Sequence, residues 1–171
     1  VEETIRLFHE DNFAQLPQLT MVWPTVEQYH PDSYPLAVLS DLLTQGKEAP
    51  LNQVLIDEAQ VAASVGSFNY DSELSGELFL SVSAFKGTDL DQVAAAIEDG
   101  FAKFESEPIS AEALERVKIN QEVAFYNALN GVLGKGAQLA QYSIFAGDPG
   151  YIDEDLARLQ AVTAEDVRRV Y

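Results

Sequence analysis

A change of hydrophobic period within residues 50–85 constrains the fold of this chain more than any other feature. The first part of the stretch, PLNQVLIDEAQ, places Leu51, Val54 and Leu55 on one side of a 3.6-residue turn, which predicts a short helix. Further along, apolar residues alternate with polar ones, which predicts strands. The turn residues NYDS, 69–72, lie between two such strands. A helix followed by a β-hairpin is therefore the predicted centre of the fold.

The second strand of this hairpin has one clearly apolar face. That face holds Leu78, Leu80, Val82 and Ala84, while Glu77, Ser81 and Ser83 lie on the other. Phe79 and Phe85 interrupt the polar face. We therefore expect the second face to be partly covered as well.

One strand and one helix are predicted before this stretch. Residues 16–24, LPQLTMVWP, alternate in polarity and are flanked by prolines, which favours a strand. The sequence HPDS, residues 30–33, is typical of a helix start, where Asp32 or Ser33 can cap free backbone amides. A stripe of leucines follows, and Gly46 can end the helix.

The chain after the hairpin is predicted to be helical. The capping signal TDLD, residues 88–91, precedes an amphipathic helix that Pro108 breaks. Ser110 caps a second, long helix. The glycines at positions 131, 134 and 136 weaken or kink that helix before residues 137–145 resume it.

A turn and two short helices complete the predicted order. The turn is GDPG, residues 147–150, and the helices are residues 153–160 and a last one that Thr163 caps, with Asp166 three places on. Because the strands cluster and a hairpin joins two of them, the fold class is α+β. It is predicted to be a mainly antiparallel sheet with helices packed on one face.

The domain organisation follows from length and pattern. A chain of 171 residues fits one domain, for which we take residues 16–171. Residues 1–15 mix acidic and apolar residues without a strong period, so we expect a linker or edge segment. Since Val1 is not an initiator methionine, we expect a fragment or a processed product.

Charge and composition exclude several classes of function. Ten basic residues against 28 acidic ones give a net charge of −18, which would repel nucleic acid and anionic membranes. The apolar runs are too short to span a bilayer. The acidity is consistent either with solubility, for example in a salty habitat, or with an acidic wall that attracts basic peptides. The chain has no cysteine, which excludes disulfides and thiolate ligands and leaves the compartment open.

The candidate catalytic residues do not have the spacing that a catalytic or metal site requires. The only histidines, His9 and His30, do not have the i, i+4 spacing of a helical metal pair, and His30 suits a capping or surface role. Asp57 and Glu58 are adjacent on a predicted helix, where their side chains diverge. No catalytic or metal site is predicted in this chain.

Two further patterns favour a structural interpretation. GVLGKG, residues 131–136, has the wrong spacing for a phosphate loop, and no strand precedes it. Asp148 suits a turn, and Tyr126, Tyr142 and Tyr151 suit the core or its rim better than a binding cage.

Four segments resemble the insulinase and pitrilysin family of zinc peptidases. They are HPDSYPLAVLSDLL from His30, PLNQVLIDEAQVAASV, FAKFESEPISAEALERVK and GDPGYIDEDLARLQAVTAEDVRRV. In order and spacing they are similar to the family's second, non-catalytic domain, across about residues 16–171. The resemblance implies a fold like that of the mitochondrial processing peptidase.

The same resemblance places the chemistry elsewhere. The family's zinc site, H-x-x-E-H with a distant glutamate, lies in a preceding domain, and this chain has no H-x-x-E-H. In the substrate-gripping copy of this domain, the family carries an arginine and a tyrosine in R-x-x-x-x-L-A-Y, which stabilise the oxyanion. The matching positions here are Ile56 and Ala63, which cannot donate side-chain hydrogen bonds. The chain alone is predicted to be inactive.

The resemblance therefore implies a structural, chamber-forming domain of a zinc-dependent metalloendopeptidase that degrades peptides, with zinc held in another domain. Its expected partners are the zinc-bearing domain and a second half-shell, in the same or a partner chain. The alternative is a non-catalytic scaffold or peptide-binding relative, like the core subunits of respiratory complexes. Bacterial members with this layout are often exported, so the periplasm is one candidate compartment.

Overall fold

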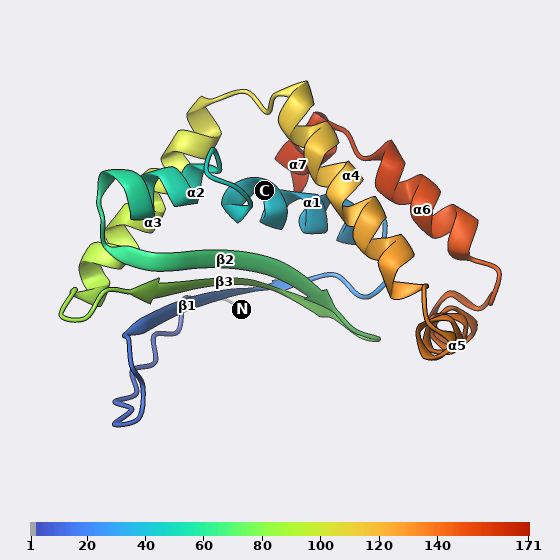
Figure 1. Ribbon diagram of the computed structural model, residues 1–171, viewed down its shortest axis with the longest axis horizontal. Helices are drawn as coiled ribbons and strands as arrows, with labels where there is room; N and C mark the ends of the chain where they lie inside the picture. The colour runs from blue at the N-terminus through green and yellow to red at the C-terminus, as the bar shows by residue number, and fades with distance from the viewer. Residues whose placement is uncertain (1–2) are drawn as a thin grey trace.

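A three-stranded sheet with a layer of helices on one face forms the body of the protein. The computed structural model describes residues 3–171. In Figure 1 the strands form the lower layer and the helices the upper one. The predicted α+β class, with helices on one face of an antiparallel sheet, is confirmed.

The sheet consists of β1 (Gln18–Thr25), β2 (Ala62–Asp71) and β3 (Gly76–Ala84) in the order β1-β3-β2. Both pairs are antiparallel, and Leu80 of β3 lies opposite Met21 and Ser67. The apolar face of β3 decides its central place, because Leu78, Leu80, Val82 and Ala84 are all buried. The predicted hairpin is present, with β3 as the central strand and β2 as an edge strand. Its turn was predicted too early, at residues 69–72, because β2 continues to Asp71 and the turn lies at residues 72–75.

Helices make up most of the remaining chain. They are α1 (Ser33–Thr44), α2 (Pro50–Asn52), the π-helix η1 (Gln53–Glu58), α3 (Leu90–Ser106), α4 (Ala111–Ala128), α5 (Val132–Gln141), the π-helix η2 (Tyr142–Ala146), α6 (Ile152–Ala161) and α7 (Ala164–Val170). The single helix predicted after Pro50 is thus α2 continued by a π-helical turn. The two short helices predicted at the end are α6 and α7.

Local capping signals were interpreted correctly at three of these helices. The side chains of Asp89, Ser110 and Thr163 accept hydrogen bonds from backbone amides of α3, α4 and α7. The capping prediction for α1 is wrong. Asp32 occupies the N-cap position but makes no side-chain cap bond. Its carboxylate instead accepts a hydrogen bond from Arg169 at 2.7 Å, because α7 lies beside the start of α1.

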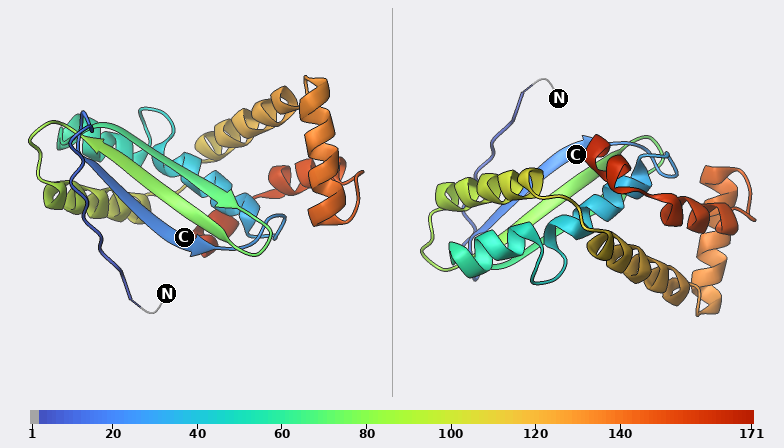
Figure 2. Two further views of the ribbon diagram at one scale, coloured as in Figure 1. Left: turned by 90° about the horizontal axis from the view of Figure 1, so that it is seen from below. Right: turned by 90° about the horizontal axis from the view of Figure 1, so that it is seen from above.

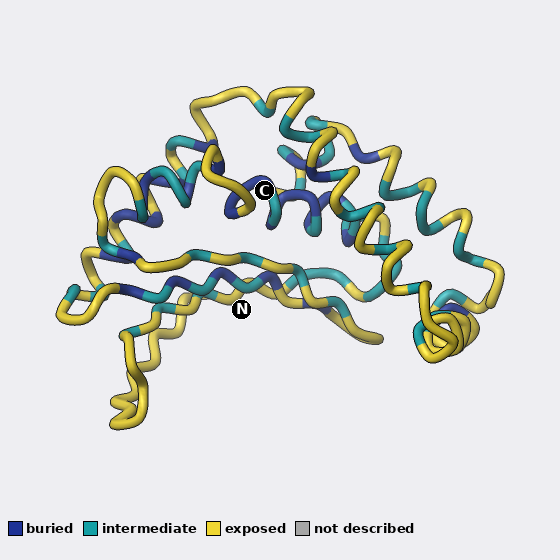
Figure 3. Tube along the Cα trace, viewed as in Figure 1, coloured by how far each residue is buried: buried dark blue, intermediate teal, exposed yellow. Residues whose placement is uncertain are grey.

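The core lies between the sheet and the first helices. Leu39 of α1, Leu55 of η1, Leu80 of β3 and Ile97 of α3 are at most 2% exposed, and Phe101 packs partly buried against them. Figure 3 shows the buried residues concentrated where the two layers meet. The opposite face of the sheet is not covered by any helix within residues 3–171.

The long kinked helix predicted after Ser110 is two helices. Figure 2 shows α5 turning sharply away from the end of α4. Gly134 makes this corner possible, because a Cβ there would lie 2.0 Å from the carbonyl oxygen of Ala128. The helix restarts at Val132 rather than at residue 137. Only Val117 of α4 is buried, while Ala124 and Ala128 near its end are exposed.

The N-terminal segment lies outside the sheet. Residues 3–17 form no helix or strand, and residues 1 and 2 of the predicted segment 1–15 lie outside the described residues. Five large apolar side chains of this segment are exposed: Ile5, Leu7, Phe8, Phe13 and Leu16. No helix within residues 3–171 is long and apolar enough to cross a membrane.

Candidate functional site

The corner between η1 and β2 brings together the backbone around Ile56 and Ala63. Gln60 turns the chain with a φ of +54°, a left-handed conformation that is uncommon outside glycine. Ala62 then pairs with Ala84 while Ser64 pairs with Ser83, so Ala63 is the extra residue of a β-bulge. Bulges redirect side chains and are common beside functional sites.

The side chains at this corner are chemically inert. Ile56 is half-buried and packs against the core, and Ala63 is exposed. Neither side chain carries an N–H or O–H donor. The nearby ammonium of Lys103 donates to Glu58 at 2.9 Å, so its charge is already paired. The corner therefore offers no side-chain hydrogen-bond donor at Ile56 or Ala63.

The open face of the sheet is nearly uncharged. Val22, Phe79 and Phe68 lie opposite one another across the three strands, and the rings of Phe68 and Phe79 stack with centroids 5.0 Å apart. Serine, threonine and glutamine side chains flank this row, and Gln18 donates to Ser81. The expectation that this face would be partly covered holds for Phe79, which is half-buried between the neighbouring strands, but not for Phe85, which follows β3 and is 45% exposed.

Two tyrosines from separate helices share one carboxylate. Asp155 of α6 accepts hydrogen bonds from Tyr34 of α1 at 2.7 Å and from Tyr142 of η2 at 2.6 Å. Burial, and next the bond to Asp155, raises the pKa of Tyr34 and of Tyr142. These phenols therefore stay protonated and act as donors, which ties α6 and η2 to α1.

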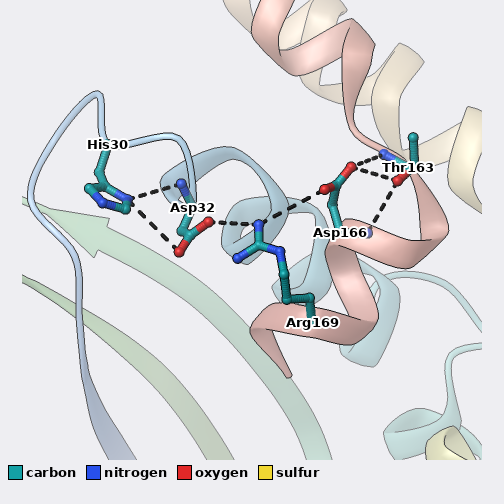
Figure 4. A network of polar contacts seen from close by, with 5 residues as sticks. All are labelled: His30, Asp32, Thr163, Asp166 and Arg169. Atoms are coloured by element: carbon teal, nitrogen blue, oxygen red, sulfur yellow. Dashed lines mark hydrogen bonds and ion pairs between the residues drawn. The ribbon is translucent and has the colours of Figure 1, made fainter.

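A second polar network joins the start of α1 to α7 (Figure 4). The Nδ1 atom of His30 accepts a hydrogen bond from the Asp32 amide at 3.1 Å. Asp32 pairs with Arg169, which also lies 3.9 Å from Asp166. The hydrogen bond from Arg169 lowers the pKa of Asp32, and hydrogen bonds from Thr163 lower the pKa of Asp166. The network is structural, because each member has a partner within the fold.

The described residues offer no group of ligands that fits a metal ion. No cluster of three or more histidine, aspartate or glutamate side chains suited to a metal occurs within residues 3–171. His9 is exposed in the N-terminal segment, and His30 is engaged at the entry to α1. These residues therefore do not fit a zinc ion, and the zinc that the family resemblance implies is expected elsewhere in the parent protein.

Comparison with protein families decides the affiliation of the chain. The family model described as the peptidase M16 inactive domain matches residues 2–121. The chain belongs to this family. A search of curated proteins finds no match for the sequence.

Solved structures share the fold of this M16 inactive domain. A protease from Helicobacter pylori has a TM-score of 0.79 at 20% identity over 94% of this chain and 38% of its own. A peptidase M16 inactive domain from Pseudomonas fluorescens has a TM-score of 0.70 at 15% identity over 90% and 36%. A chain of complex III2 from Candida albicans has a TM-score of 0.74 at 15% identity over 93% and 40%. The chain thus spans well under half the length of these three proteins.

The other residues singled out in the sequence have structural surroundings in the M16 inactive domain. Gly131 precedes α5 and Lys135 lies within it, so GVLGKG forms no phosphate loop. Asp148 accepts the Gly150 amide at 2.8 Å, as a turn former does. Of the three tyrosines weighed as core or rim residues, Tyr142 is fully buried, Tyr151 half-buried and Tyr126 exposed.

The sequence did not identify the residues that surround Tyr142 and Tyr151. These residues are Tyr29, Tyr34, Asp155 and Arg158, and their contact partners are distant in sequence. Tyr34 and Asp155 are 121 residues apart, and Arg158 donates to the Tyr29 carbonyl across 129. The crowding of tyrosines near α6 was the one available signal, and it did not identify these partners.

Proposed function

We propose that this M16 inactive domain is a structural, chamber-forming part of a zinc-dependent metalloendopeptidase that degrades peptides, with the zinc site in another domain. The open face of the sheet carries this proposal. It presents an apolar row flanked by small polar side chains, and Glu77 is the one acidic or basic residue on it. Surfaces depleted in charge and containing aromatic residues are typical of faces that contact other polypeptides.

The distribution of charge supports an inner and an outer face. The chain carries a net charge of −18, yet Asp71 and Glu77 are the only charged residues in the three strands. The acidic residues therefore belong to the helices and loops, where they favour solubility. A sheet facing a chamber and helices facing solvent fit this distribution.

Exposed apolar side chains on α4 and α5 support contact with further domains. Val123 and Tyr126 of α4 are 53% and 50% exposed, and Val132 and Leu133 of α5 are 91% and 87% exposed. No residue of α5 is buried. Apolar surface of this kind favours an interface. We assign it to contact with the zinc-bearing domain or with a second half-shell.

The chain itself supplies neither zinc ligands nor oxyanion donors in this proposal. Within residues 3–171 no ligand group for a metal is present, and Ile56 and Ala63 occupy the family's donor positions. We expect the isolated chain to bind zinc no more tightly than a few micromolar and to cleave no peptide. Calorimetry with zinc and a quenched-peptide assay measure both; chelator-sensitive cleavage would contradict the proposal.

A labelling experiment tests the chamber wall directly. These 171 residues contain no cysteine, so a thiol introduced here is the only one in this domain, and any cysteine elsewhere in the parent protein is replaced before labelling. Ser64→Cys lies on the open face of β2, and Ser106→Cys at the end of α3 is the matched exposed control. In the assembled parent protein, a bound peptide should slow maleimide labelling of the first and leave the second unchanged. If Ser64→Cys is labelled equally fast with and without peptide, the proposal that this face lines the chamber is refuted.

The alternative, a wholly non-catalytic scaffold, is favoured by one observation. The TM-score of 0.74 to a chain of complex III2 equals that to a putative zinc protease from Bordetella pertussis. The peptidase and scaffold proposals predict different sequences in the preceding domain of the parent protein. An intact H-x-x-E-H there supports the peptidase, and a degenerate one supports the scaffold.

A further inference from the structure

A cavity of about 550 Å³ lies where the β1–α1 connection, the β2–β3 turn, η2 and α6 meet. Residues 27–31, Glu73, residues 144–146, Tyr151 and Arg158 line it. Its volume falls within the range of sites that bind small ligands or single side chains. Neither the family match nor the corner at Ile56 and Ala63 accounts for it.

Aromatic rings form one wall of this cavity. The rings of Tyr29 and Tyr151 meet edge to face with centroids 5.3 Å apart. The buried ring of Tyr142 packs behind both, at 5.6 and 5.7 Å. The Tyr142 hydroxyl, behind this wall, donates a hydrogen bond to Asp155 at 2.6 Å. Aromatic faces attract cations and pack against alkyl chains.

Two unpaired carboxylates stand at the same cavity. Glu27 follows β1 and Glu73 lies in the β2–β3 turn, and both are exposed. Neither carboxylate has a hydrogen-bond or ion-pair partner among the described residues of the chain. They give the cavity a negative charge that the fold itself does not neutralise.

The positive groups of the lining are already engaged. Arg158 donates to Glu154 at 2.8 Å and to the Tyr29 carbonyl at 3.2 Å, and its guanidinium lies 5.5 Å from the centre of the Tyr151 ring. His30 accepts the Asp32 amide through Nδ1. The charge of Arg158 is therefore balanced by Glu154, and the carboxylates of Glu27 and Glu73 decide the sign of the cavity.

We propose that this cavity binds the basic side chain of a peptide, a guanidinium or an alkylammonium. The alkyl stem lies along the rings of Tyr29 and Tyr151, and the cationic end reaches Glu27 and Glu73. The net charge of −18 adds a long-range attraction for basic peptides. The inference concerns this chain alone and does not rest on the chamber-wall role.

Binding of N-acetyl-arginine amide to the 171-residue chain, followed by NMR chemical shifts, is the first test. We expect saturable binding in the millimolar range, with shifts at Tyr29, Glu73 and Tyr151. N-acetyl-citrulline amide, which keeps the shape and lacks the charge, should bind about 5- to 30-fold more weakly. Equal binding of the two amides would overturn the proposal, as would the absence of saturable arginine binding. Tighter binding of N-acetyl-glutamate amide would show that Arg158 governs the cavity instead.

A matched pair of double variants locates the site. Glu27→Gln/Glu73→Gln should weaken arginine amide binding at least about fivefold. Glu98→Gln/Glu115→Gln makes the same change of charge at exposed positions of α3 and α4 and should alter binding less than about twofold. If both double variants lose the same affinity for arginine amide, the effect comes from the overall charge of the chain, and the proposed binding site is overturned. If the first variant fails to fold, the comparison of arginine with citrulline on the unmodified chain still decides.

Discussion

Individual carboxylates of this domain respond to pH in opposite directions, because their surroundings differ. The pKa of Asp32 is lowered by the hydrogen bond from Arg169, so its stabilising effect is present above the unfolded pKa and is lost as pH falls. Burial raises the pKa of Asp41, and a hydrogen bond from Gln121 offsets part of that rise. For Asp41, the folded state binds the proton more tightly. The associated stability is therefore present at acid pH and is lost as pH rises through the folded pKa.

Asp41→Asn should stabilise the domain at pH 7. The amide oxygen can still accept the hydrogen bond that Gln121 donates at 2.7 Å, and no buried charge remains. We expect a gain of less than about 1 kcal/mol, since the group is partly solvated. Urea unfolding at pH 7 and near pH 3.5 measures it, with exposed Asp57→Asn as the control. A gain that persists unchanged at acid pH would show that the charge of Asp41 is not the cause.

The residue scale also shows where sequence information ends. Ile56 and Ala63 were assigned through the family resemblance, which matches a continuous segment of the sequence, and their correspondence to the family's donor positions stays a prediction. The bond from Tyr34 to Asp155 could not be predicted, because it depends on how α6 packs against α1. The same holds for Asp32, whose expected capping role is replaced by a bond to Arg169 from the last helix.

Elements defined by local chemistry were predicted well, and elements defined by packing were not. Caps such as Ser110 and Thr163 need only neighbouring residues. The sharp corner between α4 and α5 depends instead on the close approach of Gly134 to the Ala128 carbonyl, which no periodicity reveals. The π-helical geometry of η1 could likewise not be predicted from the sequence, since its apolar residues fit an α-helical stripe equally well.

Two glycine substitutions separate these effects in α5. Gly134→Ala should destabilise the α4–α5 corner, because the new methyl group would overlap the Ala128 carbonyl oxygen. Gly136→Ala should instead stabilise the helix by about 0.5–1 kcal/mol, since a Cβ there meets no atom within 4 Å. Thermal unfolding followed by circular dichroism compares them. Equal effects of the two variants would refute the account of this corner.

Leu80→Ala tests the assignment of the sheet faces. Leu80 is 2% exposed at the centre of β3, so we expect a loss of about 2–5 kcal/mol in the free energy of unfolding. Leu74→Ala, in the hairpin turn at 87% exposure, should cost less than about 0.5 kcal/mol. Urea unfolding measures both. A loss below about 0.5 kcal/mol for Leu80→Ala would show that the faces are reversed.

On the scale of the whole molecule, the domain is asymmetric. Helices cover one face of the sheet, and the core lies between them and the strands. The other face is open and nearly free of charged residues. Apolar surface on α5 extends away from the body, as Figure 2 shows for the helix itself. The fold class and the packing of helices on one face follow from alternation and turn residues, while the strand order β1-β3-β2 was not predicted, because it depends on how β1 packs beside β3.

The central claim is that this domain serves a zinc peptidase without supplying its chemistry. A transition-state oxyanion needs hydrogen-bond donors, and losing one typically costs about 10²–10³ in rate. Ile56 and Ala63 provide none, so the donors would come from another copy of the domain carrying R-x-x-x-x-L-A-Y. We expect that copy in a second half-shell or partner subunit.

Peptide cleavage by the zinc-containing half that includes this domain, before and after adding the second half, tests this claim most directly. The account predicts almost no turnover by the first half alone and recovery of activity as the second half is titrated in. Full turnover by the first half alone would contradict it, and so would a second half that also lacks the arginine and the tyrosine.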